Sequence, residues 1–222
     1  MSEVEGQSDL EAQSDFDARP DPEATKAAKS LADRFGWRHS HDDTSLLEEW
    51  PGAPFGAGMH VGVHNIVRAS VDGVDVVAFD YNFIAREDQQ YIDRYNPAMR
   101  QHYLVAVATV GAPLPAMSAT EGKWAHWTPS GDRVGGDHPR FFTHYEVFSD
   151  DPDFAAAVLR DEHLDRILHR MQATEWRTHS HHLVCWGHNQ KVGHDLENLL
   201  AALVPLAHEM RAAAGAGSSG AG

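Results

Sequence analysis

The chain of 222 residues lacks the features that mark membrane proteins and nucleic-acid-binding proteins. It has no apolar run that approaches about 18 residues, so we predict no transmembrane segment. It has 18 Lys and Arg against 33 Asp and Glu, and the resulting net charge of −15 opposes binding to nucleic acid and to anionic lipid. The acidic N-terminus has no apolar core of the kind found in secretory signals. We therefore expect a cytoplasmic protein.

Cysteine is also nearly absent, since Cys185 is the one cysteine in the chain. This excludes an intramolecular disulfide and a cysteine-based zinc site. The sequence contains no HExxH, no GxSxG and no glycine-rich GxGxxG turn before a helix. We accordingly predict no cofactor and assign no catalytic residue, and we interpret Cys185 as a small buried apolar side chain.

Composition divides the chain into a central domain and two tails. Residues 1–20 are acidic and show no hydrophobic periodicity, which predicts a disordered tail. Residues 213–222 are rich in Gly, Ala and Ser and predict a flexible tail or an added linker. Between them, residues 21–212 hold enough apolar side chains for a single α+β domain.

Alternating apolar residues predict an antiparallel sheet. The expected strands are residues 61–67, 74–81, 101–110, 116–119 and 141–148, followed by a hairpin over residues 176–186. On the first strand, Val61, Val63 and Val67 should share one face and His60 and His64 the other.

Proline and capping residues predict where the helices begin. Asp21-Pro22 and Asp151-Pro152 are typical of helix starts, and a leucine-rich pattern predicts a last helix over residues 194–212. Strands without alternating helices indicate α+β rather than a doubly wound fold. The expected architecture is a strongly bent antiparallel sheet with a packed C-terminal helix, of which the pleckstrin-homology-like barrel is one example.

The sixteen histidines are the main candidates for chemistry. Histidines spaced as His-x-His on a strand share a face and can supply two metal ligands. His179 and His181 are the candidate metal ligands on this ground, and His39 with His41 and His60 with His64 form similar pairs. The alternative is that these side chains are solvated on polar faces and in turns.

Two further groups have both a structural and a functional interpretation. Asp80, near the end of an apolar strand, either caps a turn or presents a catalytic carboxylate. Trp124, Trp127, Phe141 and Phe142 flank a glycine-rich loop, where they either cover the end of the sheet or form a recognition patch.

Several short motifs resemble a family of uncharacterised actinobacterial proteins of unknown function. They are Arg-Phe-Gly-Trp at residues 34–37, Pro-Phe-Gly at 54–56, Ala-Phe-Asp-Tyr at 78–81, Pro-Leu-Pro at 113–115 and the tryptophan hairpin at 176–186. The resemblance covers about residues 31–205 and implies no known activity and no catalytic residues. Members often carry membrane segments, whereas this sequence predicts none, so we do not transfer a membrane role.

Two hypotheses about function follow. The first is a non-enzymatic α+β domain that binds a protein partner or acts as a regulatory module. The alternative is a histidine-based, metal-dependent enzyme such as a hydrolase. Convergence of three histidines or carboxylates in one pocket would favour the enzyme, and their scatter over the surface would favour the binding domain.

Overall fold

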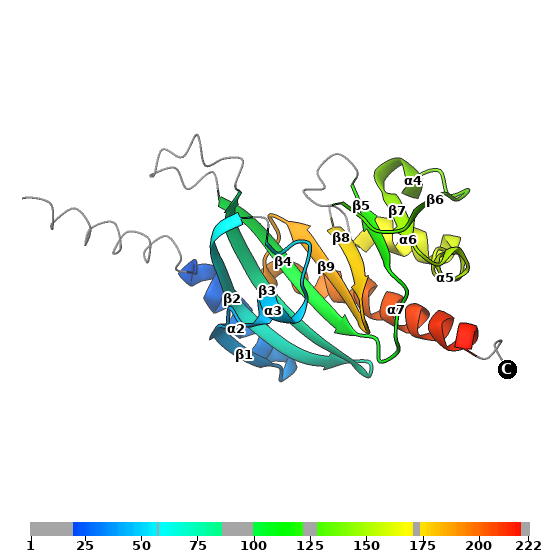
Figure 1. Ribbon diagram of the computed structural model, residues 1–222. Helices are drawn as coiled ribbons and strands as arrows, with labels where there is room; N and C mark the ends of the chain where they lie inside the picture. Colours follow the sequence, from blue (N-terminus) through cyan, green and yellow to red (C-terminus); the bar gives the residue numbers. More distant parts are fainter. Residues whose placement is uncertain (1–19, 57, 86–99, 122–127, 171–173, 219–222) are drawn as a thin grey trace, which may run out of the picture.

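A computed structural model describes residues 20–56, 58–85, 100–121, 128–170 and 174–218. Its centre is one sheet with the strand order β1-β2-β3-β4-β9-β8-β5-β7-β6, and all pairings between these strands are antiparallel (Figure 1). The order has two ends, so the sheet is open rather than a closed barrel. The strands are β1 (Arg38–Asp42), β2 (Gly58–Val71), β3 (Val74–Ala85), β4 (Arg100–Thr109), β5 (Met117–Thr120), β6 (Asp132–Val134), β7 (Glu146–Ser149), β8 (Thr174–His179) and β9 (His182–His188).

Helices cover the two faces of the sheet unequally. The helices are α2 (Pro22–Phe35), α3 (Leu46–Glu49), α4 (Phe141–His144), α5 (Pro152–Val158), α6 (Asp161–Arg170) and α7 (Val192–Ser218). Helices α2 and α7 pack on one face, which we call the inner face, and α5 and α6 contact α7 there. Short α3 lies on the opposite, outer face (Figure 1). The α+β class, the antiparallel sheet and the packed C-terminal helix are therefore confirmed.

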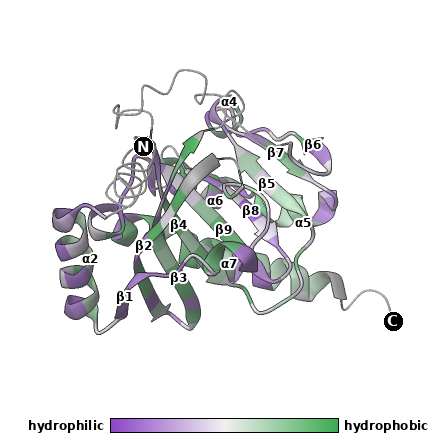
Figure 2. Ribbon diagram, turned by 60° about the vertical axis from the view of Figure 1, so that its left-hand side comes forward, coloured by the Kyte–Doolittle hydropathy of each residue, from purple (hydrophilic) through white to green (hydrophobic). Residues whose placement is uncertain are grey.

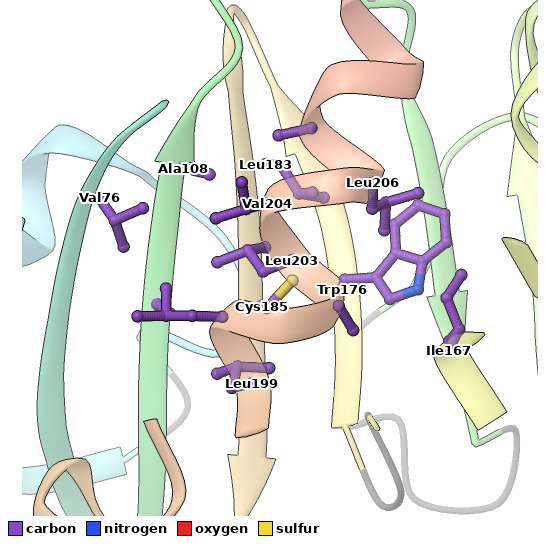
Figure 3. Packing of buried hydrophobic residues seen from close by; sticks show 14 of the residues in the cluster. Val76, Ala108, Ile167, Trp176, Leu183, Cys185, Leu199, Leu203, Val204 and Leu206 are labelled. Carbon is purple, nitrogen blue, oxygen red and sulfur yellow. The ribbon is translucent and has the colours of Figure 1, made fainter. Parts of the chain in front are cut away.

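The inner core forms between α7 and the middle of the sheet. Trp176 of β8 and Cys185 of β9 are fully buried against Leu203 and Leu206 of α7 (Figure 3). Burying a large aromatic or aliphatic side chain stabilises the fold by roughly 1.5–3 kcal/mol. Burial also raises the pKa of the Cys185 thiol well above its ordinary value, so the interpretation of Cys185 as an inert apolar residue is confirmed.

The outer core is aromatic and lies over β2, β3, β4 and β9. Trp50 and Phe55, from the segment after α3, stack on Phe79 of β3, with ring centroids 6.4 and 6.1 Å away. Phe79 and Phe83 of β3 are buried in this core. Figure 2 shows apolar colour along the central strands and polar residues along α2 and β1.

The expected helix starts are confirmed. Asp21 Oδ1 accepts a hydrogen bond from the Glu23 amide at 3.0 Å, and Asp151 Oδ1 accepts one from the Phe154 amide at 2.9 Å. Gly36, with φ of 68°, ends α2 in a left-handed conformation that favours glycine. The hairpin of β8 and β9 also forms where the sequence predicted it.

The expected strand over residues 141–148 is wrong in its first half. Residues Phe141–His144 form α4, and only Glu146–Ser149 form a strand, β7. Phe141 and Tyr145 are four residues apart, and their rings stack with centroids 5.0 Å apart. Residues four apart share a face on a helix and also on a strand. The aromatic pattern therefore did not distinguish a helix from a strand here.

The expected faces of the first strand are also wrong. Val63 lies in the outer core and Val67 in the inner core. The register shifts between His64 and Val67, where Asn65 has a φ of 54°. This bulge inserts one extra residue and exchanges the two faces beyond it.

The expected end of the last helix at residue 212 is wrong, because α7 continues to Ser218, and Ala213 and Ala214 pack against the inner core. The expected acidic tail, apart from residue 20, lies outside the described residues, as do Trp124 and Trp127. Among the helices that the structure describes, none combines the length and the apolar character needed to cross a bilayer.

Candidate functional site

A partly buried carboxylate on the inner face holds the start of α7. Asp80 Oδ1 accepts a hydrogen bond from the Val192 amide at 2.8 Å, and Oδ2 accepts one from Asn65 Nδ2 at 2.7 Å. Burial raises the pKa of Asp80, while these two hydrogen bonds oppose the rise. Asp80 therefore caps a helix that begins far along the chain, whereas the sequence suggested a cap for its own turn.

His64 and Asp42 form the one described histidine–carboxylate pair within β1 and β2. His64 Nδ1 lies 2.6 Å from Asp42 Oδ1, and His64 is only 7% exposed. A Cβ at Gly62 would come within 2.5 Å of His64 Nε2, so any larger residue there would displace the His64 ring. The expectation of a solvated histidine is thus wrong for His64, which is part of the fold.

The two candidate metal ligands lie at the tip of the β8–β9 hairpin. His179 ends β8, and His181 lies in the turn, where its ring is 4.1 Å from that of His182. Burial, followed by Arg177 and His181, lowers the pKa of His179. Over the described part of the chain, no three His, Cys, Asp or Glu side chains gather as a metal site would require. Metal binding by His179 and His181 stays a prediction.

A hollow of about 260 Å³ lies beside this hairpin. Its wall includes one cation, one histidine and several hydroxyl groups, and no carboxylate lines it among the described residues. Buried Ser118 and Arg177 belong to the wall, whereas Ser130 and Ser180 are exposed. The polar part of the wall can thus donate hydrogen bonds and holds no described acid, in a protein of net charge −15.

Arg177 is a buried cation whose described partners are all carbonyl groups. Nε donates to the Ala53 oxygen at 2.6 Å, and Nη2 donates to the oxygens of Trp50 and Pro51 at 3.0 and 2.8 Å. Burial lowers its pKa to about 10. Gly52, with φ of 97°, brings this segment close to the guanidinium. Two N–H bonds of Nη1 have no acceptor among the described residues.

Ser118 lies directly opposite Arg177 on the neighbouring strand. The register of β5 and β8 pairs the two residues, so their side chains share the outer face. Ser118 is 4% exposed, and its Oγ has no hydrogen-bond partner among the described residues. The wall of the hollow therefore includes a buried hydroxyl and a buried guanidinium, each with donors that no described residue uses.

The nearest carboxylate along β8 is already engaged. Glu175 accepts hydrogen bonds from Thr120 Oγ1, from the Glu121 amide at 3.1 Å and from Trp186 Nε1 at 2.9 Å. These contacts tie β8 to β5 and β9. Glu175 thus serves the sheet and supplies no counter-charge to Arg177.

Sequence reasoning identified one residue of the hollow, His179, and missed Arg177 and Ser118. A signal was present, because Glu175, Arg177 and His179 alternate with Trp176 and Thr178 on β8. This alternation predicts a strand with one polar face. That Ser118 lies opposite Arg177 could not be predicted in this way, because it depends on the register between two distant segments.

The fold is similar to a solved structure. It is the crystal structure of the mycobacterial trehalose monomycolate transport factor A, TtfA, with a TM-score of 0.58 and 14% sequence identity, over 87% of this chain and 95% of that chain. At this identity the likeness shows the fold alone. No protein-family model and no curated protein sequence matches the chain.

Proposed function

We propose that this chain is a non-enzymatic accessory protein that acts by binding, as a protein-binding or regulatory domain. The observation that carries the proposal is the donor-lined hollow beside Arg177 and Ser118. It offers hydrogen bonds to a ligand, yet its described serines are not paired with an oriented base. A nucleophile needs a base that a third group orients.

The pairs that could begin such a catalytic set lie on different parts of the sheet. Ser180 Oγ is 3.1 Å from His181 Nδ1 at the β8–β9 turn, and His181 has no described carboxylate partner. His64 and Asp42 form their pair on β2 and β1, and β3, β4 and β9 separate β2 from β8. This separation supports binding over acyl transfer.

The fold supports an accessory role. The neighbour of similar fold is described as a transport factor, a description that names no catalytic activity. We extend this accessory character to the present chain, with a protein partner and a cytoplasmic location as parts of the proposal.

The rival hypothesis is a metal-dependent hydrolase that uses His179 and His181. The test is to incubate the full chain with p-nitrophenyl acetate and p-nitrophenyl phosphate, alone, with Zn²⁺ or Mn²⁺, and with a chelator. We expect rates equal to those without protein in every arm, and no metal in stoichiometric amount in the purified protein.

His179→Asn and His194→Asn serve as matched variants in this assay, since His194 is exposed at the start of α7 and distant from the hairpin. Turnover that requires metal, is removed by the chelator and is lost in His179→Asn but retained in His194→Asn would overturn the binding proposal. It would also establish the hairpin histidines as metal ligands.

A further inference from the structure

We propose that the hollow beside the β8–β9 hairpin is a binding subsite for a small organic oxyanion, a carboxylate or a phosphate monoester, held by Arg177 Nη1 and Ser118 Oγ. The inference rests on the proposed function and names the class of ligand. Three independent features carry it, namely the missing counter-charge, the unused donors and the size of the hollow.

The first feature is the missing counter-charge. A buried cation is costly unless it is paired, and buried arginines are usually compensated by a carboxylate. Arg177 is 8% exposed and has carbonyl oxygens as its described partners. Glu175, the neighbouring acid on the same strand, is bonded to other groups. An oxyanion in the hollow would supply the charge that the described residues do not.

The second feature is the set of donors left unused. Arg177 uses Nε and Nη2 to hold the segment that contains Trp50 and Ala53. Its Nη1 takes no part in these hydrogen bonds. The buried Ser118 Oγ likewise has no partner among the residues that the structure describes. A carboxylate or phosphate accepts several hydrogen bonds at once, and a guanidinium and a hydroxyl on opposed strand positions can bind two of its oxygens.

The third feature is the size and character of the hollow. Its volume of about 260 Å³ is slightly below the range of roughly 300–1,000 Å³ that is common for small-molecule sites. Leu114 and Met117 add apolar surface to the wall. The hollow therefore suits an acid group with a short organic stem.

The test uses the full chain and calorimetry in a buffer free of carboxylate and phosphate, with ionic strength held constant by NaCl. The probes are propionate, methyl phosphate and propionamide, the last being a neutral isostere of propionate. We expect at least one oxyanion to bind and propionamide not to bind. Equal heats from propionate and propionamide, or no binding of either oxyanion, would overturn the proposal without requiring any variant.

The matched variants are Ser118→Ala in the hollow and Ser70→Ala at an exposed position on β2. Loss of one hydrogen bond to a charged ligand weakens binding by roughly tenfold or more, so Ser118→Ala should reduce the affinity by that factor. Ser70→Ala should bind like the unmodified chain. An unchanged affinity in Ser118→Ala would contradict the assignment of this site.

The source of the oxyanion is distinguished by sedimentation with vesicles. Vesicles that contain phosphatidic acid carry a phosphate monoester on a lipid, and neutral phosphatidylcholine vesicles are their control. Co-sedimentation that Ser118→Ala abolishes assigns a lipid headgroup, and binding of the soluble probes alone assigns a free solute. Hydrolase activity would refute the proposed binding function, but it would not change the results of the calorimetry or the sedimentation. If no oxyanion binds, the proposed oxyanion site is refuted, whereas the proposed binding function still stands.

Discussion

The outer face of the sheet has two halves that differ in kind. Over β3 and β4 it is closed by aromatic residues, with Trp50, Phe55 and Tyr81 packed around Phe79. Over β5 and β8 the same face carries Ser118 and Arg177 beside a hollow. In the aromatic half, side chains fill the space above the sheet. In the polar half, a hollow remains, and groups that can donate hydrogen bonds line it.

The boundary between the halves shows how they depend on each other. The segment that brings Trp50 to the aromatic half is anchored by Arg177 from the polar half. A residue at such a boundary can hold a loop and still present a free N–H to a ligand. The comparison therefore predicts that stability resides mainly in the aromatic half and ligand binding in the polar half.

The largest expected effect is in the aromatic half. Phe79 is fully buried, so Phe79→Ala should lower the free energy of unfolding by about 3–5 kcal/mol in urea titrations. Phe35→Ala, at a side chain that is 46% exposed, is the control and should change it by about 0.5 kcal/mol or less. A loss below about 1 kcal/mol for Phe79→Ala would show that this half does not carry the stability.

The next effect is at the boundary. Arg177→Met leaves the carbonyls of Trp50, Pro51 and Ala53 without their donors, at a cost of about 2–3 kcal/mol, partly offset because a buried charge is removed. Limited proteolysis should also begin to cut near residues 50–53. Unchanged stability together with unchanged proteolysis would mean that Arg177 does not anchor this segment.

A smaller effect concerns pH. Burial, then His181 and His179, lowers the pKa of His182 from its ordinary value of 6.5. The unfolded chain therefore binds more protons than the folded chain below about pH 6.5, and stability falls as the pH drops through that window. We expect the melting temperature to fall from pH 7.5 to 5.5, and to fall less in His182→Gln.

His194→Gln, at an exposed histidine, is the control for this measurement and should keep the pH dependence of the unmodified chain. His39 and His179 also have lowered pKa values because of burial, so some dependence should persist in His182→Gln. A steeper fall in His182→Gln would reverse the sign of the argument.

The smallest expected effect on stability is in the polar half. Ser118→Ala removes a buried hydroxyl without a partner, so the free energy of unfolding should change by about 0.5 kcal/mol or less, or increase. Thermal and urea unfolding check this. A loss as large as that of Arg177→Met would show that Ser118 Oγ serves the fold, and would remove the contrast between the two halves.

Much of the fold was predictable because its signals are local. Alternation marked β3 and β4, and an aspartate before a proline marked the starts of α2 and α5. The bulge at Asn65 was not predictable, because one extra residue in a strand leaves no mark in composition. It moved Val67 to the opposite face from Val63.

The candidate site was less predictable than the fold. Its parts come together through the pairing of β5 with β8 and through the anchoring of residues 50–53 by Arg177. Both depend on contacts between segments distant in the chain. His179 was predicted as a metal ligand from its spacing to His181, and the structure places it instead in the wall of the hollow, with its metal role untested.

The pairing of β4 with β9 has a consequence for the chain during its synthesis. All strands from β1 to β4 come before residue 110, whereas β9, which pairs with β4 through Ala106 and Cys185, and α7 come last. Until the ribosome has released that final segment, β4 presents an unpaired apolar edge, the kind that recruits other chains. Truncation within β9 or α7 should therefore produce aggregates rather than a smaller folded domain.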